Sequence, residues 1–148
     1  MDIAEDLENM RKLAKVVKDD TDAFSAIKRI ADTQKDILSR RLKEGGSNLH
    51  DLYESTSGKL KAWPDLRSFN SAFVKYLSDL DILIDSCDQK TDGVVLSLTF
   101  DSLQTSIDTM KSRLLLLKDD AVLREELKGL GLMTGMLDFA IKELGVNI

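Results

Sequence analysis

Apolar residues recur at alternating steps of three and four along most of this 148-residue chain. That spacing places them on one side of an α-helix, so it predicts a succession of amphipathic helices. The first is expected between Asp2 and Lys18, and the carboxylate and hydroxyl side chains of residues 19–22 then offer caps for the next helix. The apolar positions of the first helix are Ile3, Leu7, Met10, Ala14 and Val17.

The second helix is expected to end at Gly45 and Gly46, because glycine after a helical stripe commonly marks a C-terminus. A short third helix would then run from Ser47 to Tyr53. Pro64 suits the first turn of a fourth helix, where its missing N–H would be unpaired in any case. The apolar stripe of that fourth helix is Leu66, Phe69, Phe73, Leu77, Leu80, Ile84 and Cys87.

The segment from Val94 to Phe100 supports two interpretations. Apolar and polar residues alternate there, as they do in a half-buried strand. However, Leu96 and Phe100 also begin a helical stripe that continues to Leu117. No other segment has a convincing strand pattern, and a lone strand would lack a partner in a monomer. We therefore predict a fifth helix through this segment.

A sixth helix is predicted after Asp120, and it carries two apolar stripes. One is an ordinary core stripe, made of Leu123, Leu127, Leu130, Leu137, Ile141 and Leu144. The other consists of Leu132, Met136 and Phe139 and lies near the opposite side of the helix. A helix that is apolar on two sides is typical of the centre of a bundle. The alternative is that this second stripe stays exposed and receives a partner helix or a second copy of the chain.

Composition supports one folded domain over residues 1–148, an antiparallel all-α bundle of five or six helices. Hydrophobic residues make up 43% of the chain and charged residues 32%, with a single proline, which favours long helices. The formal charge of −5 argues against a nucleic-acid partner. The apolar runs are too short for a transmembrane segment. An acidic start without an apolar signal core leads us to expect a cytoplasmic protein.

Residues that could perform chemistry are few. Cys87 is the only cysteine, so no internal disulfide is expected, and together with His50, the only histidine, it cannot complete a zinc site. A nucleophilic pair of these two would require both in one cleft. Cys87, however, continues a core stripe and is expected to be a small buried hydrophobe.

Two groups of aspartates are candidate sites. Asp88–Gly93 resembles the start of a calcium loop, but Lys90 stands where that loop needs an oxygen ligand and Thr99 where it needs a bidentate glutamate, so a capped turn is the better interpretation. Asp81 and Asp85 lie with Asp88 along one flank of the fourth helix. Acid–base catalysis would need partial burial of such carboxylates, whereas this flank is expected to be solvated.

With no catalytic constellation, no metal site and no cofactor site in view, we expect a non-enzymatic protein–protein interaction module: an adaptor, chaperone, regulator or structural subunit. Its candidate contact residues are Leu132, Met136 and Phe139, which would bind a protein partner or form a homodimer through a helix face. The alternative is a bundle that binds an apolar ligand or engages a membrane. Fold analogy cannot decide between them, because helical bundles carry unrelated functions.

Overall fold

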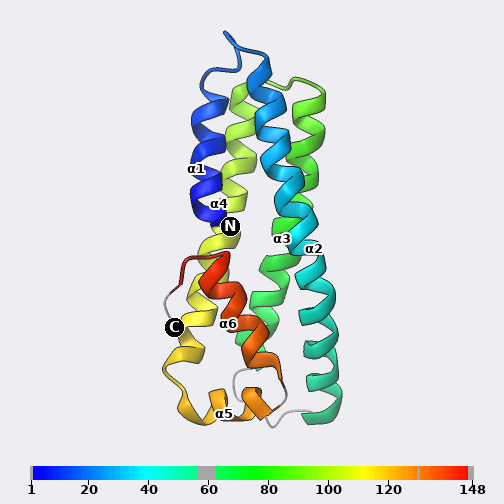
Figure 1. The fold of residues 1–148 in the computed structure, drawn as a ribbon, viewed down its shortest axis with the longest axis vertical. Coiled ribbons are helices and arrows are strands. Elements are labelled where there is room, and N and C mark those ends of the chain that lie inside the picture. The colour runs from blue at the N-terminus through cyan, green and yellow to red at the C-terminus, as the bar shows by residue number, and fades with distance from the viewer. Residues whose placement is uncertain (1, 57–62, 130, 147–148) are drawn as a thin grey trace.

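A computed structural model describes residues 2–56, 63–129 and 131–146, with their side chains except those of residues 44–56, 63 and 132–134. Within these ranges the chain forms six α-helices and no strand, which confirms the predicted all-α bundle. The helices are α1 (Ile3–Ala14), α2 (Asp22–Thr56), α3 (Trp63–Asp88), α4 (Gly93–Lys118), α5 (Ala121–Gly129) and α6 (Leu132–Lys142). Figure 1 shows α2, α3 and α4 running the length of the bundle and α5 crossing one end.

Among the three long helices, α3 packs against both α2 and α4 and runs antiparallel to each, and polar contacts on the bundle surface mark their register. Lys28 on α2 pairs with Asp88 on α3 over 2.6 Å. Arg113 near the end of α4 pairs with Asp65 at the start of α3 over 3.1 Å. Beneath these pairs lies one continuous apolar core to which all six helices contribute. Its fully buried side chains include Tyr76, Phe100, Ile3, Leu7, Met10, Ile27, Leu38, Leu66, Leu80, Leu83 and Leu96.

Two short helices share the fourth position of the bundle. From a rise of 1.5 Å per residue, α3 and α4 are each about 39 Å long, whereas α1 is about 18 Å and α6 about 16 Å. Both α1 and α6 pack against α2 and α4, α1 along one half of the bundle and α6 along the other (Figure 1). The fourth position is therefore filled from the two ends of the chain.

The two short helices meet end to end near the middle of the bundle. The N–H of Ile3, at the start of α1, donates to the carbonyl oxygen of Glu143, just after α6, over 2.8 Å. Asp2 caps α1 by accepting from the N–H of Ala4 over 3.0 Å. On the other side of the junction Gly145 has a φ of 65°, which turns the chain away from the end of α6. This backbone connection ties both ends of the described chain to one place.

A buried polar chain joins three helices beside this junction. Gln34 on α2 donates through its side-chain amide to Asp6 on α1 over 3.2 Å. The hydroxyl of Tyr76 on α3 donates to the amide oxygen of Gln34. Burial, reinforced by the charge of Asp6, raises the pKa of Tyr76 far above its ordinary value, so the phenol remains a neutral donor. The side-chain amide of Gln34 is thus bonded on both sides and sets the relative positions of α1, α2 and α3.

The expected helix end at Gly45 and Gly46 was wrong: α2 continues through both glycines to Thr56. The predicted short helix at Ser47–Tyr53 is therefore the last part of α2. Glycine weakens a helix interior by about 1 kcal/mol but ends it only where the backbone turns left-handed. As a result Arg41, four residues before the expected helix end, lies within α2.

The expectation of one continuous sixth helix was also wrong, because the chain turns between α5 and α6. Gly131 adopts a φ of 72° there, a conformation that costs little only for glycine. At the other end of the chain, α1 stops at Ala14, short of the expected Lys18, although Val17 still reaches the core. The turn at Gly131 directs α6 back along the bundle.

The disputed segment from Val94 to Phe100 is helical and forms the first two turns of α4. Asp92 caps this helix by accepting from the N–H of Val94 over 2.9 Å, which confirms the predicted capped turn. Leu96 and Phe100 face the core, as the helical interpretation requires.

Two glycines, one at the end-to-end junction and one inside α6, are expected to respond oppositely to substitution by alanine. Gly145→Ala should destabilise the fold by about 1–2 kcal/mol, because alanine disfavours positive φ and its Cβ would lie 3.3 Å from the Asp2 carboxylate. Gly135→Ala should stabilise it by about 1 kcal/mol, since Gly135 lies inside α6 with no atom within 4 Å of the added Cβ. Urea unfolding followed by circular dichroism measures both, and equal shifts of the same sign would contradict the geometry.

Candidate functional site

The second apolar stripe of the C-terminal region points into the bundle. Met136 and Phe139 are only 6% and 4% exposed. The ring of Phe139 lies 4.9 Å from that of Phe73 and 5.9 Å from that of Phe69, measured between ring centroids. The side chain of Leu132, the third residue of the stripe, lies outside the described residues. Met136 and Phe139 are therefore core residues and offer no surface to a partner in this arrangement.

The turn at Gly131 decides which side of α6 faces inward. Ala140 is buried beside Phe139, whereas Ile141, which the sequence pattern assigns to the core, is 55% exposed. No atom of another described segment lies within 4 Å of a Cβ built on Gly131 or Gly135, so neither glycine serves a close contact with that part of the structure. The bundle-centre interpretation of the stripe thus agrees with the packing of Met136 and Phe139.

One buried charge accompanies α6 at the junction with α1. The side chain of Glu143 is 5% exposed, and its Oε1 lies 3.7 Å from an Arg41 nitrogen on α2. No described residue donates a hydrogen bond to the second carboxylate oxygen. Because leaving a buried carboxylate unpaired is costly, Arg41 stabilises the docking of α6 rather than binding an external anion.

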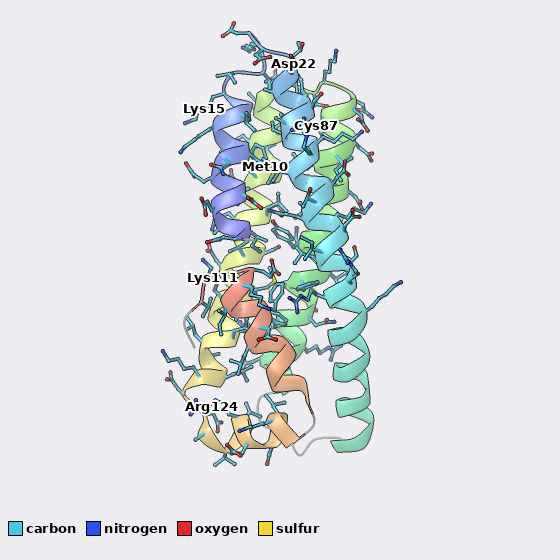
Figure 2. All side chains as sticks on the ribbon, viewed as in Figure 1. Met10, Lys15, Asp22, Cys87, Lys111 and Arg124 are labelled. Carbon is cyan, nitrogen blue, oxygen red and sulfur yellow. The ribbon has the colours of Figure 1, made fainter. Side chains whose placement is uncertain are left out.

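Cys87 and His50 are not brought together. Cys87 lies near the end of the bundle where Asp22 begins α2 (Figure 2). His50 lies on α2 about six turns beyond Lys28, or roughly 33 Å along the axis, and Lys28 is the residue that pairs with Asp88 beside Cys87. Burial, with help from Asp88, raises the pKa of the Cys87 thiol to about 11. The thiol is thus a poor nucleophile, and the backbone of His50, whose side chain lies outside the described residues, is far from it along the bundle.

The three aspartates on the flank of α3 are solvated. Asp81 and Asp88 pair with Lys35 and Lys28 at the edge facing α2, and both carboxylates are about half exposed. Asp85 is exposed between them. This arrangement agrees with a charged helix surface, and within the described residues no group of three or more His, Cys, Asp or Glu side chains is placed to hold a metal ion.

A different surface becomes visible on the outer seam of α3 and α4. Ser102 on α4 donates to Asp79 on α3 over 2.6 Å, and Lys75 donates to Ser102 over 2.7 Å. Because the two helices are antiparallel, the next turns along this seam place Ile82 of α3 level with Leu98 of α4. The seam is polar at the Ser102 level and apolar beyond it.

We call the four exposed hydrophobic residues of this region the α3/α4 apolar patch. Their exposed fractions run from 45% to 71%, and the members are Ile82, Val94, Val95 and Leu98. On α4, Val94 and Leu98 are one turn apart on the side opposite Leu96 and Phe100. Large hydrophobic side chains that gather on a surface commonly mark an interaction site, whereas scattered ones do not.

The sequence pattern that produces this patch is the alternation of apolar and polar residues, which is also typical of a strand. Alternate residues in a helix lie about 200° apart, so an alternating apolar pattern puts hydrophobic side chains on two opposite sides. The strand-like pattern from Val94 to Phe100 is that case: Leu96 and Phe100 are buried, and Val94 and Leu98 are exposed. The stripe that continues to Leu117 predicts Leu96 and Phe100 as the buried pair, and the packing of α4 agrees.

Comparisons with known proteins add no functional information. A scan against protein-family models, a search of curated proteins and a search of solved structures each found no match. Among the described residues, no helix combines the length and apolar character needed to cross a membrane. The candidate site therefore rests on the chain's own residues.

The burial of α6 predicts different outcomes for two substitutions on that helix. Met136→Ser should destabilise the protein by about 2–5 kcal/mol, because it removes buried apolar volume and adds a buried hydroxyl. Ile141→Ser should change stability by less than about 0.5 kcal/mol, since Ile141 is exposed. Chemical unfolding of both variants checks this, and a fully stable Met136 variant would show that α6 is not docked as described.

The environment of Cys87 predicts slow thiol chemistry. With a pKa of about 11, roughly one thiol in a thousand is ionised at pH 8. Labelling of the folded protein with a chromogenic disulfide should therefore be slow, rise with pH, and accelerate more than about 100-fold in urea. Equal rates for the folded and unfolded chain would contradict the burial of Cys87.

Proposed function

We propose that this protein is a non-enzymatic interaction module that binds a protein partner through the α3/α4 apolar patch. The observation that carries the proposal is the exposure of four large hydrophobic side chains, Ile82, Val94, Val95 and Leu98, which the helical register set by the Ser102–Asp79 contact places along one seam. Burying such side chains fully is worth about 1.5–3 kcal/mol each, so four of them can anchor a specific complex.

The location of the patch favours binding over a structural role within the fold. The core beneath it is already complete, since Leu96, Phe100 and Leu83 are buried there. The other exposed large hydrophobic residues lie at the turn after α1, in the first half of α3, near the end of α4, and on α5 and α6. The patch costs solubility without adding to the core, which suits a surface that a partner covers.

The chemistry of the described residues supports a non-enzymatic role. Cys87 is buried with a raised pKa and lies far from His50 along the bundle. The flanking aspartates Asp81 and Asp88 form exposed ion pairs. None of these groups has the partial burial or the neighbouring base that acid–base or nucleophilic catalysis uses.

The contact residues expected from the sequence do not form the binding surface in this proposal. Met136 is buried, and Phe139 packs against Phe69 and Phe73, so a partner could reach them only if α6 left the bundle. The α3/α4 apolar patch needs no such rearrangement. Contact through the patch is therefore the simpler route to binding.

Site-specific photo-crosslinking tests the proposal. A photoreactive residue at position 98, introduced in the cells that make the protein, should give one defined adduct with another protein. The same residue at position 122 is the matched control, because Val122 is equally exposed but lies on α5. The identified partner should bind the purified protein, and Leu98→Ser should weaken binding at least about tenfold.

Three results would contradict this function. Adducts of equal yield at positions 98 and 122 would indicate chance collisions. An adduct between two copies of the 16.5 kDa chain would indicate a homodimer instead. A co-purifying lipid in native mass spectra, without any protein adduct, would support the apolar-ligand alternative.

A further inference from the structure

Negative charge is concentrated on the part of the bundle that carries the patch. The stretch from Ser78 to Asp108 contains seven aspartates and a single lysine, Lys90. Its formal charge of −6 exceeds in magnitude the −5 of the whole chain. The rest of the protein is thus close to neutral, and the electrostatic field is localised on one half of α3 and α4.

Only some of these carboxylates are neutralised within the protein. Lys35 and Lys28 pair with Asp81 and Asp88 at the edge facing α2. Lys75 pairs with Asp79, and Arg11 with Asp101 at the edge facing α1. The aspartates that form no ion pair with a described residue are Asp85, Asp92 and Asp108. All three are exposed.

Helical register puts the acidic residues around the apolar ones. Asp85 follows Ile82 by three residues on α3, which places it one turn away on the same side. On α4, Asp101 and Asp108 follow Val94 at successive steps of seven, so they continue the same outward stripe. Asp101 is paired with Arg11 but its side chain is 65% exposed, which leaves it accessible to a second cation. The seam is therefore apolar at one end and acidic along its edges.

We infer that the partner segment is a basic amphipathic helix of about four turns. Its apolar side would cover Ile82, Val94 and Leu98, and its lysine or arginine side chains would meet Asp85, Asp92 and Asp108. The distance from Val94 to Asp108 along α4 is about 21 Å at 1.5 Å per residue, which fits such a helix. This inference rests on the proposed function, because it names the partner of the same surface.

Charge also favours a cationic helix over the other possible occupants of the patch. A symmetric dimer through the patch would bring two stretches of −6 formal charge together, which electrostatic complementarity disfavours. Anionic lipid and nucleic acid would be repelled for the same reason. A cationic helix gains both from apolar burial and from long-range attraction.

Two synthetic peptides test the inference on the full chain. Both are 18-residue amphipathic helices with the same leucines, one with lysine and the other with glutamate on the polar side. The lysine peptide should bind one-to-one and shift the amide NMR signals of residues 82, 94 and 98, and its affinity should fall as salt is raised. The glutamate peptide should not bind.

Matched variants separate the apolar and the charged contributions. Ile82→Ser with Leu98→Ser should weaken the lysine peptide at least about tenfold, while Val122→Ser should have no effect. Asp85→Asn with Asp108→Asn should also weaken it about fivefold or more. Glu125→Gln with Glu126→Gln, two exposed acidic residues on α5, removes the same charge elsewhere and should leave the affinity unchanged.

The inference is overturned if the two peptides bind equally, if both double-charge variants have the same effect, or if the protein binds phosphatidylserine vesicles through the patch. It also fails, while the proposed function stands, if the protein crosslinked at position 98 contacts the patch through a segment without net positive charge. Loss of the crosslink itself would remove the proposed function as well.

Discussion

The bundle depends on filling its fourth helix position along the whole length of α3 and α4. An apolar face left in water costs about 25 cal/mol for each Å² that could have been buried. α1 covers only half of the required length, and α6 supplies the rest from the other end of the chain. The hydrogen bond from the Ile3 N–H to the Glu143 carbonyl joins the two segments. The folded state therefore requires both ends of the described chain at once.

The inward side of α6 follows from that requirement. To complete the position, α6 has to return along the bundle, and the left-handed Gly131 provides the turn. This orientation buries Met136 and packs Phe139 against Phe69 and Phe73. Glu143 is drawn in beside Arg41 in the process. A stripe that could have served binding is thereby used for stability, and the exposed apolar surface is found on α4 instead.

Much of the fold was predictable because helical periodicity is local. The stripes of α1, α3 and α4 each identify core residues correctly, from Ile3 to Leu117. The errors arose where one residue type permits two backbone conformations. Gly45 and Gly46 remain helical, whereas Gly131 turns left-handed, and neighbouring residues do not distinguish them. The α3/α4 apolar patch was missed for another reason: its residues come from two helices, and only the packing of α3 beside α4 brings Ile82 to the same seam as Leu98.

The sequence by itself determined that this protein is an all-α bundle, that its charge is acidic, and that the described aspartates cap helices and line their outer surfaces. These properties follow from spacing and composition within single helices. Only the tertiary structure decided which apolar side of α6 is covered and which exposed residues of α3 and α4 lie together, because both depend on neighbours that are distant in sequence. It places Met136 inside the bundle and leaves Leu98 exposed, on a helix whose Asp101 and Asp108 are exposed as well.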